Sequence, residues 1–250
     1  MQIDVITLFP GLVSAIRDYG VVGRALRSER VKLGVTNPRE YSRDTNNRVD
    51  DRPYGGGPGM IMQYEPLVRA IDETVAKTDA QSTVVYLSPQ GKPLDQKAVR
   101  SFSEIDHLVL LCGRYEGIDE RIIQARVDQE WSIGDYVISG GELAAMIVID
   151  AVVRTLPGVL GDEQSAQQDS FEQGLLDCPH YTRPECIQGF TVPEVLLSGD
   201  HQMIDRWRLK QMLGRTFLRR ADMIEKLSLN EQEHHLLDEY LAEEKEKNER

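Results

Sequence analysis

The stretch SIGDYVISGGELAAM, Ser132–Met146, places two breaks in regular structure directly before a very apolar helical pattern. Gly134-Asp135 and Ser139-Gly140-Gly141 flank the apolar tripeptide Tyr136-Val137-Ile138, and the helical pattern follows over Glu142–Val153. Glycine lets another backbone or a ligand come close, and the start of a helix offers free N–H groups. The stretch therefore fits a site that holds a planar ligand through main-chain hydrogen bonds. It also fits a tight strand-to-helix turn of any α/β protein.

Two further loops of unusual sequence lie upstream, each between a predicted strand and a predicted helix. The apolar run Thr83–Leu87 leads into Ser88–Pro93, and the run His107–Leu111 leads into Cys112–Gly117. Strands that alternate with helices predict a parallel sheet, whose ligands bind where the strands end. We expect these two loops and the stretch around Gly134 to converge on one pocket.

The N-terminal third adds two strands and a glycine-rich loop. Gln2–Phe9 and Val31–Thr36 have strand patterns, and Leu12–Arg27 and Glu65–Lys77 have helical spacing. Between them, Arg52–Met60 (RPYGGGPGM) holds four glycines and two prolines and cannot form regular structure. Such a loop is either a flexible connector or a place where the backbone approaches a ligand.

The C-terminal part predicts a second domain. Apolar helical spacing ends at Leu156-Pro157-Gly158, and long helices are expected over His201–Arg220 and Asn230–Lys247. We therefore expect an α/β domain over residues 1–158, a polar linker or mobile lid over 159–177, and a small, mainly helical domain over 178–250.

Composition narrows the class of protein. The 250 residues have a net charge of −12, so the overall charge does not indicate a nucleic-acid partner. Gly199–Arg220 nevertheless holds six basic side chains against two acidic ones, which suits either a surface that steers a polyanion or an ordinary solvated helix. Three scattered cysteines without a CxxC pair argue against disulfides and zinc and favour the cytoplasm. We expect no membrane segment, because the apolar run Leu143–Val153 is too short to span a bilayer. We also expect no signal peptide at the N-terminus.

The common ligand and catalytic motifs are missing from the sequence. It contains no GxGxxG, GxxxxGK[ST], HExxH or GxSxG. An α/β protein without these motifs needs another way to bind a ligand. Here the backbone N–H and C=O groups of the glycine-containing loops could form the hydrogen bonds to it.

The loops carry a resemblance to a known family. LLCGRYEGIDERI (Leu110–Ile122), SIGDYVISGGELAAM and Thr7–Pro10 (TLFP), with RPYGGGPGM and YLSPQG, resemble the bacterial tRNA (guanine-37-N1)-methyltransferases of the SPOUT class. The resemblance covers nearly the whole chain. It implies a parallel sheet whose domain ends in a trefoil knot, S-adenosylmethionine bound in the knot, a homodimer with shared active sites, and tRNA as substrate. It also implies a requirement for Mg²⁺, although the sequence shows no carboxylate cage for a metal.

The resemblance assigns site residues by position. It implies Asp169 as the general base and Arg154 as the residue that orients the guanine and offsets its charge. Gly59, Arg114 and His180 are candidates for tRNA contacts. The residues that it implies for the cofactor come from three loops: Tyr86, Leu87, Ser88 and Pro89; Gly113, Tyr115 and Glu116; and Ile133, Gly134, Tyr136, Val137, Ile138, Gly140 and Gly141.

The chemistry of guanine agrees with these roles. N1 of guanine carries a proton and is a poor nucleophile, so the reaction needs proximity and a base. A carboxylate on a closing lid can take the proton, and an arginine can stabilise charge on O6. Without the resemblance, Asp169 is an ordinary linker acid and Arg154 an arginine that suits the end of a helix. Three alternatives remain: a SPOUT enzyme acting on ribose or another base, an RNA-binding protein without activity, and a flavodoxin-like nucleotide-binding protein.

Overall fold

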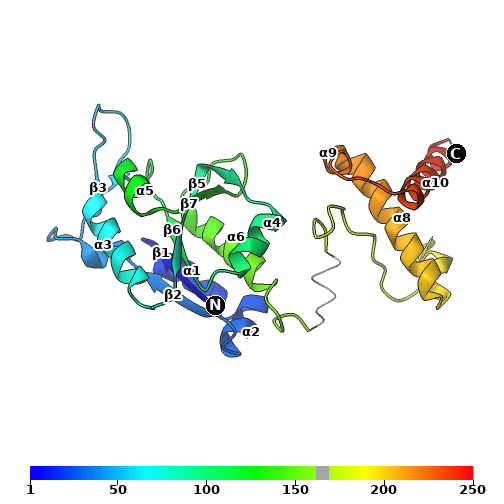
Figure 1. The fold of residues 1–250 in the computed structure, drawn as a ribbon, viewed down its shortest axis with the longest axis horizontal. Coiled ribbons are helices and arrows are strands. Elements are labelled where there is room, and N and C mark those ends of the chain that lie inside the picture. The colour runs from blue at the N-terminus through cyan, green and yellow to red at the C-terminus, as the bar shows by residue number, and fades with distance from the viewer. Residues whose placement is uncertain (162–168, 250) are drawn as a thin grey trace. The chain divides into compact units, whose positions relative to one another are not determined.

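The computed structural model of the protein describes residues 1–161 and 169–249, and the chain divides into two compact units, residues 1–163 and 164–250 (Figure 1). A five-stranded parallel sheet with the order β2-β1-β6-β5-β7 forms the centre of the first unit. This confirms the predicted α/β class and its parallel sheet. The strands are β1 (Gln2–Ile6), β2 (Lys32–Thr36), β5 (Ser82–Pro93), β6 (His107–Cys112) and β7 (Gln129–Ser132).

Helices cover both faces of this sheet (Figure 1). In β6, Leu108 and Leu110 face one cluster of buried side chains, whereas Val109 and Leu111 face the other. A strand that is buried on both faces is apolar at every position, which explains the continuous run HLVLL. The first face packs against α1 (Pro10–Ser14), α2 (Gly20–Arg27), α4 (Gln96–Ser103) and α6 (Gly141–Val153), and the second against α3 (Tyr64–Val75) and α5 (Glu120–Arg126).

The single helix expected over Leu12–Arg27 is wrong, because the chain turns in the middle of it. After α1 and a short 3-10 helix, Tyr19 is extended and Gly20 has φ +62°, a left-handed backbone that favours glycine. The helical spacing continues across the turn because Val13 and Val22, on either side, enter the same core.

The loop expected over Ser88–Pro93 lies inside a longer strand. Leu87 and Lys92 of β5 both align with Trp131 of β7, so the residues between them bulge out of the ladder. A Cβ atom on Gly91 would lie 2.3 Å from the Trp131 backbone nitrogen, so only glycine fits. The turn residues in Ser88–Pro93 thus correspond to this bulge, and β5 pairs with β7 again after it.

A buried polar network lies towards the N-terminal ends of the strands. His107 Nε2 is 3.0 Å from Asp4 Oδ2, and His107 Nδ1 is 2.7 Å from Ser82 Oγ. Lys77 Nζ donates to Asp4 Oδ1 at 3.1 Å and to Thr36 Oγ1 at 2.8 Å. Serine, histidine and aspartate also form hydrolase triads, but here Asp4 and His107 are shielded from solvent. We therefore assign this network to stability.

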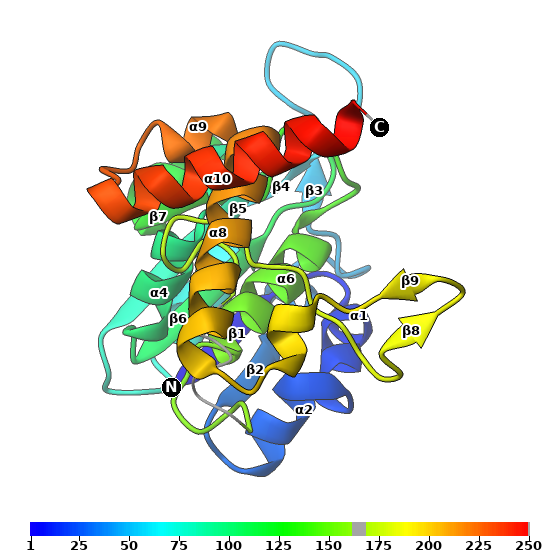
Figure 2. The same ribbon diagram turned by 90° about the vertical axis from the view of Figure 1, so that its right-hand side faces the viewer.

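The second unit is mainly helical. Figure 2 shows α10 (Glu231–Asn248) crossing α8 (His201–Arg219), with α9 (Ala221–Ile224) beside them. Gly214 permits this approach, because a Cβ atom there would lie 2.0 Å from the Tyr240 ring. The rest of the described unit includes a 3-10 helix, Glu194–Leu197, and the hairpin of β8 (Cys186–Ile187) and β9 (Phe190–Thr191).

The predicted linker over 159–177 is described only at its ends. Val159 packs in the core of the first unit, and Leu175 packs in the core of the second. Residues 162–168 lie outside the described residues, so the role of this segment as a lid stays a prediction. Among the residues that the structure describes, no helix is both long and apolar enough to cross a bilayer.

We expect Asp4→Ala to lower the free energy of unfolding by about 3 kcal/mol, because it leaves His107 and Lys77 without their shared acceptor. Urea unfolding followed by circular dichroism measures the change. The control Glu104→Gln, at an exposed position, should stay within about 0.5 kcal/mol of wild type. Equal stability of Asp4→Ala and wild type would contradict a structural role for the network.

Candidate functional site

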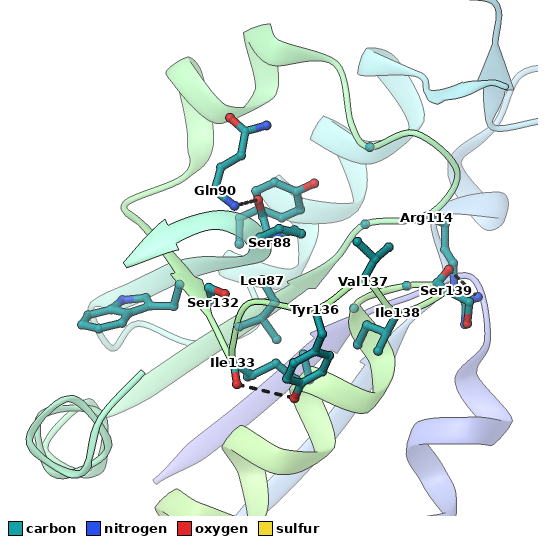
Figure 3. A pocket seen from close by; sticks show the side chains of 18 of the residues that line it. Leu87, Ser88, Gln90, Arg114, Ser132, Ile133, Tyr136, Val137, Ile138 and Ser139 are labelled. Carbon is teal, nitrogen blue, oxygen red and sulfur yellow. Dashed lines mark hydrogen bonds between the residues drawn. The ribbon is translucent and has the colours of Figure 1, made fainter. Parts of the chain in front are cut away.

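A cavity of about 310 Å³ lies at the C-terminal ends of β6 and β7 and beside the bulge of β5 (Figure 3). All three loops singled out in the sequence line it, through residues 86–90, 113–117, 131–134 and 136–141. The strand order explains this, because β5 lies between β6 and β7, so its bulge lies beside the loops that follow these two strands. All of the residues predicted to bind the cofactor line this cavity, and their binding role stays a prediction.

Sequence reasoning missed several residues of the cavity wall. Most of them are sequence neighbours of predicted residues, and Ala144 lies one turn further along α6, so a broader reading of each segment would have found them. Arg114, predicted for another role, also lines the cavity. The missed residues are Gln90, Gly117, Trp131, Ser132, Ser139 and Ala144.

The third loop passes close to the backbone of the second. The Gly141 N–H donates to the Gly113 carbonyl at 3.0 Å. A Cβ atom on Gly141 would lie 2.7 Å from Cys112 Cα, so this approach requires glycine. Main chain therefore forms part of the cavity wall, as expected for a site that recognises a ligand by backbone hydrogen bonds.

Burial raises the pKa of two ionisable groups beside the cavity. Burial raises the pKa of Tyr86 to about 12, and the charge of Glu130 adds to this. Burial also raises the pKa of the Cys112 thiol well above its usual value, with a contribution from Glu142. Both side chains stay protonated at neutral pH, so they present neutral groups.

A cavity of this volume with mixed lining suits a drug-sized or nucleoside-sized ligand. Leu87, Ile133 and Ile138 supply apolar surface, and the glycines leave space at the backbone that a Cβ atom would fill. In Figure 3 the side chains of Ile133, Tyr136 and Ile138 lie together on one wall. These features fit an adenosyl group, which needs apolar contact with its ring and polar contacts at its edge.

The glycine-rich loop lies between β3 (Asp50–Asp51) and β4 (Ile61–Met62) and extends away from the sheet (Figure 1). Its base contacts the second cavity loop, since the Glu116 N–H donates to the Met60 carbonyl at 2.9 Å. Gly59 lies against Glu116, where a Cβ atom would be 2.4 Å from Oε1. The tRNA contact predicted for Gly59 stays a prediction, at a position that adjoins the cavity.

The two predicted catalytic residues lie outside the cavity lining. Arg154 follows the last residue of α6, whereas the cavity touches the first turn of that helix. Asp169 is partly buried in the second unit, where its carbonyl accepts a hydrogen bond from the Glu172 N–H at 3.3 Å. The catalytic roles of both residues stay predictions.

His180 belongs to a small polar group in the second unit. His180 Nε2 lies 2.8 Å from Asp177 Oδ2, and the imidazole is largely exposed. Asp177, Cys178 and His180 offer ligand atoms within 4.8 Å of one another, and no other such group occurs among residues 1–161 and 169–249. Mg²⁺ prefers oxygen ligands, and this group offers a single carboxylate, so it does not fit the Mg²⁺ that the resemblance implies.

Much of the positive charge predicted on α8 is neutralised within the second unit. Arg206 and Lys210 pair with Glu239 and Glu243 of α10, each at 2.6 Å. Arg208 and Arg220 also pair with neighbouring aspartates. The helix therefore offers less free charge to a polyanion than its sequence suggests, and its contact with tRNA stays a prediction.

Comparisons with known proteins point to one family. The sequence model of the family tRNA (Guanine-1)-methyltransferase TrmD matches residues 1–226. A tRNA (guanine-N(1)-)-methyltransferase of Pseudomonas putida (strain W619) is 57% identical over 243 residues, which cover 97% of each chain. Proteins of the same name from Shewanella sp. (strain ANA-3) and Shewanella sediminis (strain HAW-EB3) are 56% identical over 241 residues. These cover 96% of this chain and 97% and 100% of the two relatives.

We expect iodoacetamide at pH 8 to alkylate the exposed Cys186 and to spare Cys112. The thiolate is the reactive form, and the raised pKa keeps the buried Cys112 thiol protonated. Peptide mass spectrometry gives the extent of labelling at each cysteine, and protein unfolded in guanidinium chloride, where all cysteines react, is the control. Labelling of Cys112 in the folded protein as fast as Cys186 would contradict the packing beneath the cavity.

Proposed function

Because the chain belongs to the tRNA (guanine-1)-methyltransferase family, we propose that it methylates N1 of the guanine directly 3′ of the anticodon, with S-adenosylmethionine as donor. The chain is a methyltransferase, an enzyme that transfers one-carbon groups. The observation that carries the finer proposal is the convergence of the three glycine-containing loops on one cavity. We place the reaction in the cytoplasm, where tRNA is found.

The cavity residues would hold S-adenosylmethionine, which supplies an activated methyl group on its sulfonium when bound. Ile133 and Ile138 would pack against the adenine, and the backbone around Gly140 and Gly141 would hydrogen-bond its edge. Leu87 and Tyr86 would close the opposite wall, in surroundings that exclude water. This arrangement contributes proximity and orientation.

Asp169 and Arg154 would act on the guanine. Asp169 accepts the N1 proton, which leaves the nitrogen lone pair free to attack the methyl group. Arg154 donates hydrogen bonds to O6, where negative charge develops as the proton leaves. The proton thus moves to the carboxylate, and the base carries the methyl group at N1.

We propose that Arg154 serves the cavity of a second copy of the chain. Helix α6 has 13 residues and is therefore roughly 20 Å long at 1.5 Å per residue, with the cavity at its first turn and Arg154 after its last residue. The same helix exposes about half of Leu143 and Ile147, one turn apart on one face, and Val137 beside the cavity is 89% exposed. An apolar surface of this kind suits a homodimer interface. Such a dimer would bring one protomer's Arg154 to its partner's cavity.

We also infer that the chain is threaded into a knot beneath the cavity. Two close backbone approaches support this: Gly91 against Trp131, and Gly141 against Cys112. Segments far apart in sequence thus pass one another with no side chain between them. Knots are rare in proteins, so the inference rests mainly on the family resemblance.

We expect methyl transfer from labelled S-adenosylmethionine to an unmodified tRNA transcript with guanine 3′ of the anticodon. Replacing that guanine by adenine removes the acceptor, and Asp169→Ala should lower the rate about 10²-fold or more through loss of the base. Scintillation counting of precipitated tRNA follows the reaction. Transfer that persists without the guanine would instead favour methylation of ribose or another base, and donor binding without any transfer would favour an RNA-binding protein.

Mixed dimers test the shared site. Gly140→Val distorts the cavity wall, because even a Cβ atom there would lie 2.2 Å from Arg114 Nε, and Arg154→Ala removes the guanidinium. A heterodimer purified through two different tags contains one intact site only if Arg154 acts across the dimer. We expect it to recover about half of the wild-type rate, while each mutant homodimer stays inactive. A heterodimer as inactive as both homodimers would show that each site is built within one protomer.

A further inference from the structure

Glu142 is a fully buried carboxylate beside the cavity that has no part in the chemistry proposed above. It lies in the first turn of α6, where the helix N-terminus favours negative charge. Thr7 Oγ1 donates to Glu142 Oε1 at 2.7 Å, and Arg114 Nε donates to Oε2 at 2.8 Å. A carboxylate this deeply buried is unfavourable unless it is paired and hydrogen-bonded, so both partners are needed.

Arg114 connects this carboxylate to the third cavity loop. Its Nη1 donates to the Ser139 carbonyl at 2.9 Å, as Figure 3 shows. Its guanidinium carbon lies 4.3 Å from the centre of the Phe9 ring, a cation–π contact. Gly140 lies directly against the guanidinium, where a side chain would collide with it. One arginine thus joins the end of β1, the second loop and the third loop.

Between its ends, the third loop makes few other polar contacts with the rest of the fold. Within the described part of the chain, the other hydrogen bonds of residues 134–139 are local, such as Tyr136 N–H to the Gly134 carbonyl at 3.0 Å. Tyr136 is about half exposed and Val137 almost wholly exposed. The bond from Arg114 to Ser139 therefore acts together with the Gly141–Gly113 backbone bond to tie this cavity wall to the rest of the fold.

We propose that Arg114 and Glu142 are positioning residues for the methyl donor, a proposal that rests on the function proposed above. Glu142 fixes the Arg114 guanidinium, and Arg114 fixes Ser139 and thereby the Tyr136–Ile138 segment in the form that lines the cavity. Lysine has a single nitrogen in place of the planar guanidinium, so it cannot bond Glu142 and Ser139 in the same geometry. The pair therefore determines affinity for the donor through loop geometry.

This role can be separated from the tRNA contact predicted for Arg114. Loss of a tRNA contact raises the Kd for tRNA and reduces its salt dependence, and leaves donor binding unchanged. Loss of the loop anchor raises the Kd and KM for the donor and leaves the Kd for tRNA unchanged. A purely structural role lowers thermal stability, and donor affinity of the folded protein stays the same.

The test is isothermal titration calorimetry with S-adenosylmethionine on the full chain, for wild type, Arg114→Lys and Glu142→Gln. We expect the donor Kd of both variants to rise about tenfold or more, with tRNA Kd within about twofold of wild type. The matched control is Arg126→Lys, which disturbs the Arg126–Asp72 pair on the surface of the same unit and should leave donor Kd unchanged. Thr7→Val, which keeps the ion pair, should give an intermediate rise and serves where Glu142→Gln does not fold.

Unchanged donor Kd in folded Arg114→Lys would overturn the proposal, and weakened tRNA binding in that variant would assign the arginine to tRNA. If wild type itself fails to bind S-adenosylmethionine, the donor assignment falls and this proposal falls with it. If wild type and every variant bind S-adenosylmethionine equally well, the donor assignment stands and only the positioning role is overturned.

Discussion

Backbone lies directly against backbone at two points beside the cavity, and both contacts depend on glycine. Gly91 passes the main chain of Trp131, and Gly141 passes that of Cys112, at separations where a Cβ atom would lie 2.3 Å and 2.7 Å away. Cores are packed too tightly for such contacts to be relieved by small shifts. The three loops are therefore held together by their own main chain, and the shape of the cavity follows from that constraint.

A cavity built in this way suits the transfer of an activated methyl group. The neighbouring ionisable side chains Tyr86 and Cys112 stay protonated, because burial raises the pKa of each. The first unit thus supplies orientation, and the proposed base and its arginine come from outside the cavity wall. The proposed dimer has a physical reason in this separation of donor binding from base chemistry, since α6 places Arg154 at the opposite end of the helix from its own cavity.

Local sequence patterns predicted most helices and strands. The features that they did not predict depend on contacts between residues far apart in the sequence. The strands, the parallel sheet and the convergence of the loops follow from alternating strand and helix patterns. The role of Glu142 could not be predicted, because its partner Thr7 lies 135 residues away and an acid at a helix start looks like ordinary capping. The turn at Gly20 could not be recognised in the sequence, because the helices on either side of it bury apolar residues in the same core and the helical spacing continues across it. Likewise, only the register with β7 shows that β5 resumes after its bulge. The roles of Asp169 and Arg154 came from the family resemblance, since neither has a distinctive pattern of its own.

Hydrogen–deuterium exchange with and without S-adenosylhomocysteine tests most directly whether the three loops form one donor site. Slower amide exchange is expected in residues 86–90, 113–117 and 133–141 together, because the ligand would cover all three. The β8–β9 hairpin, in the other unit, should exchange at the same rate in both samples. Protection confined to one loop, or found only outside all three, would contradict a donor site at the C-terminal ends of β6 and β7 and beside the bulge of β5.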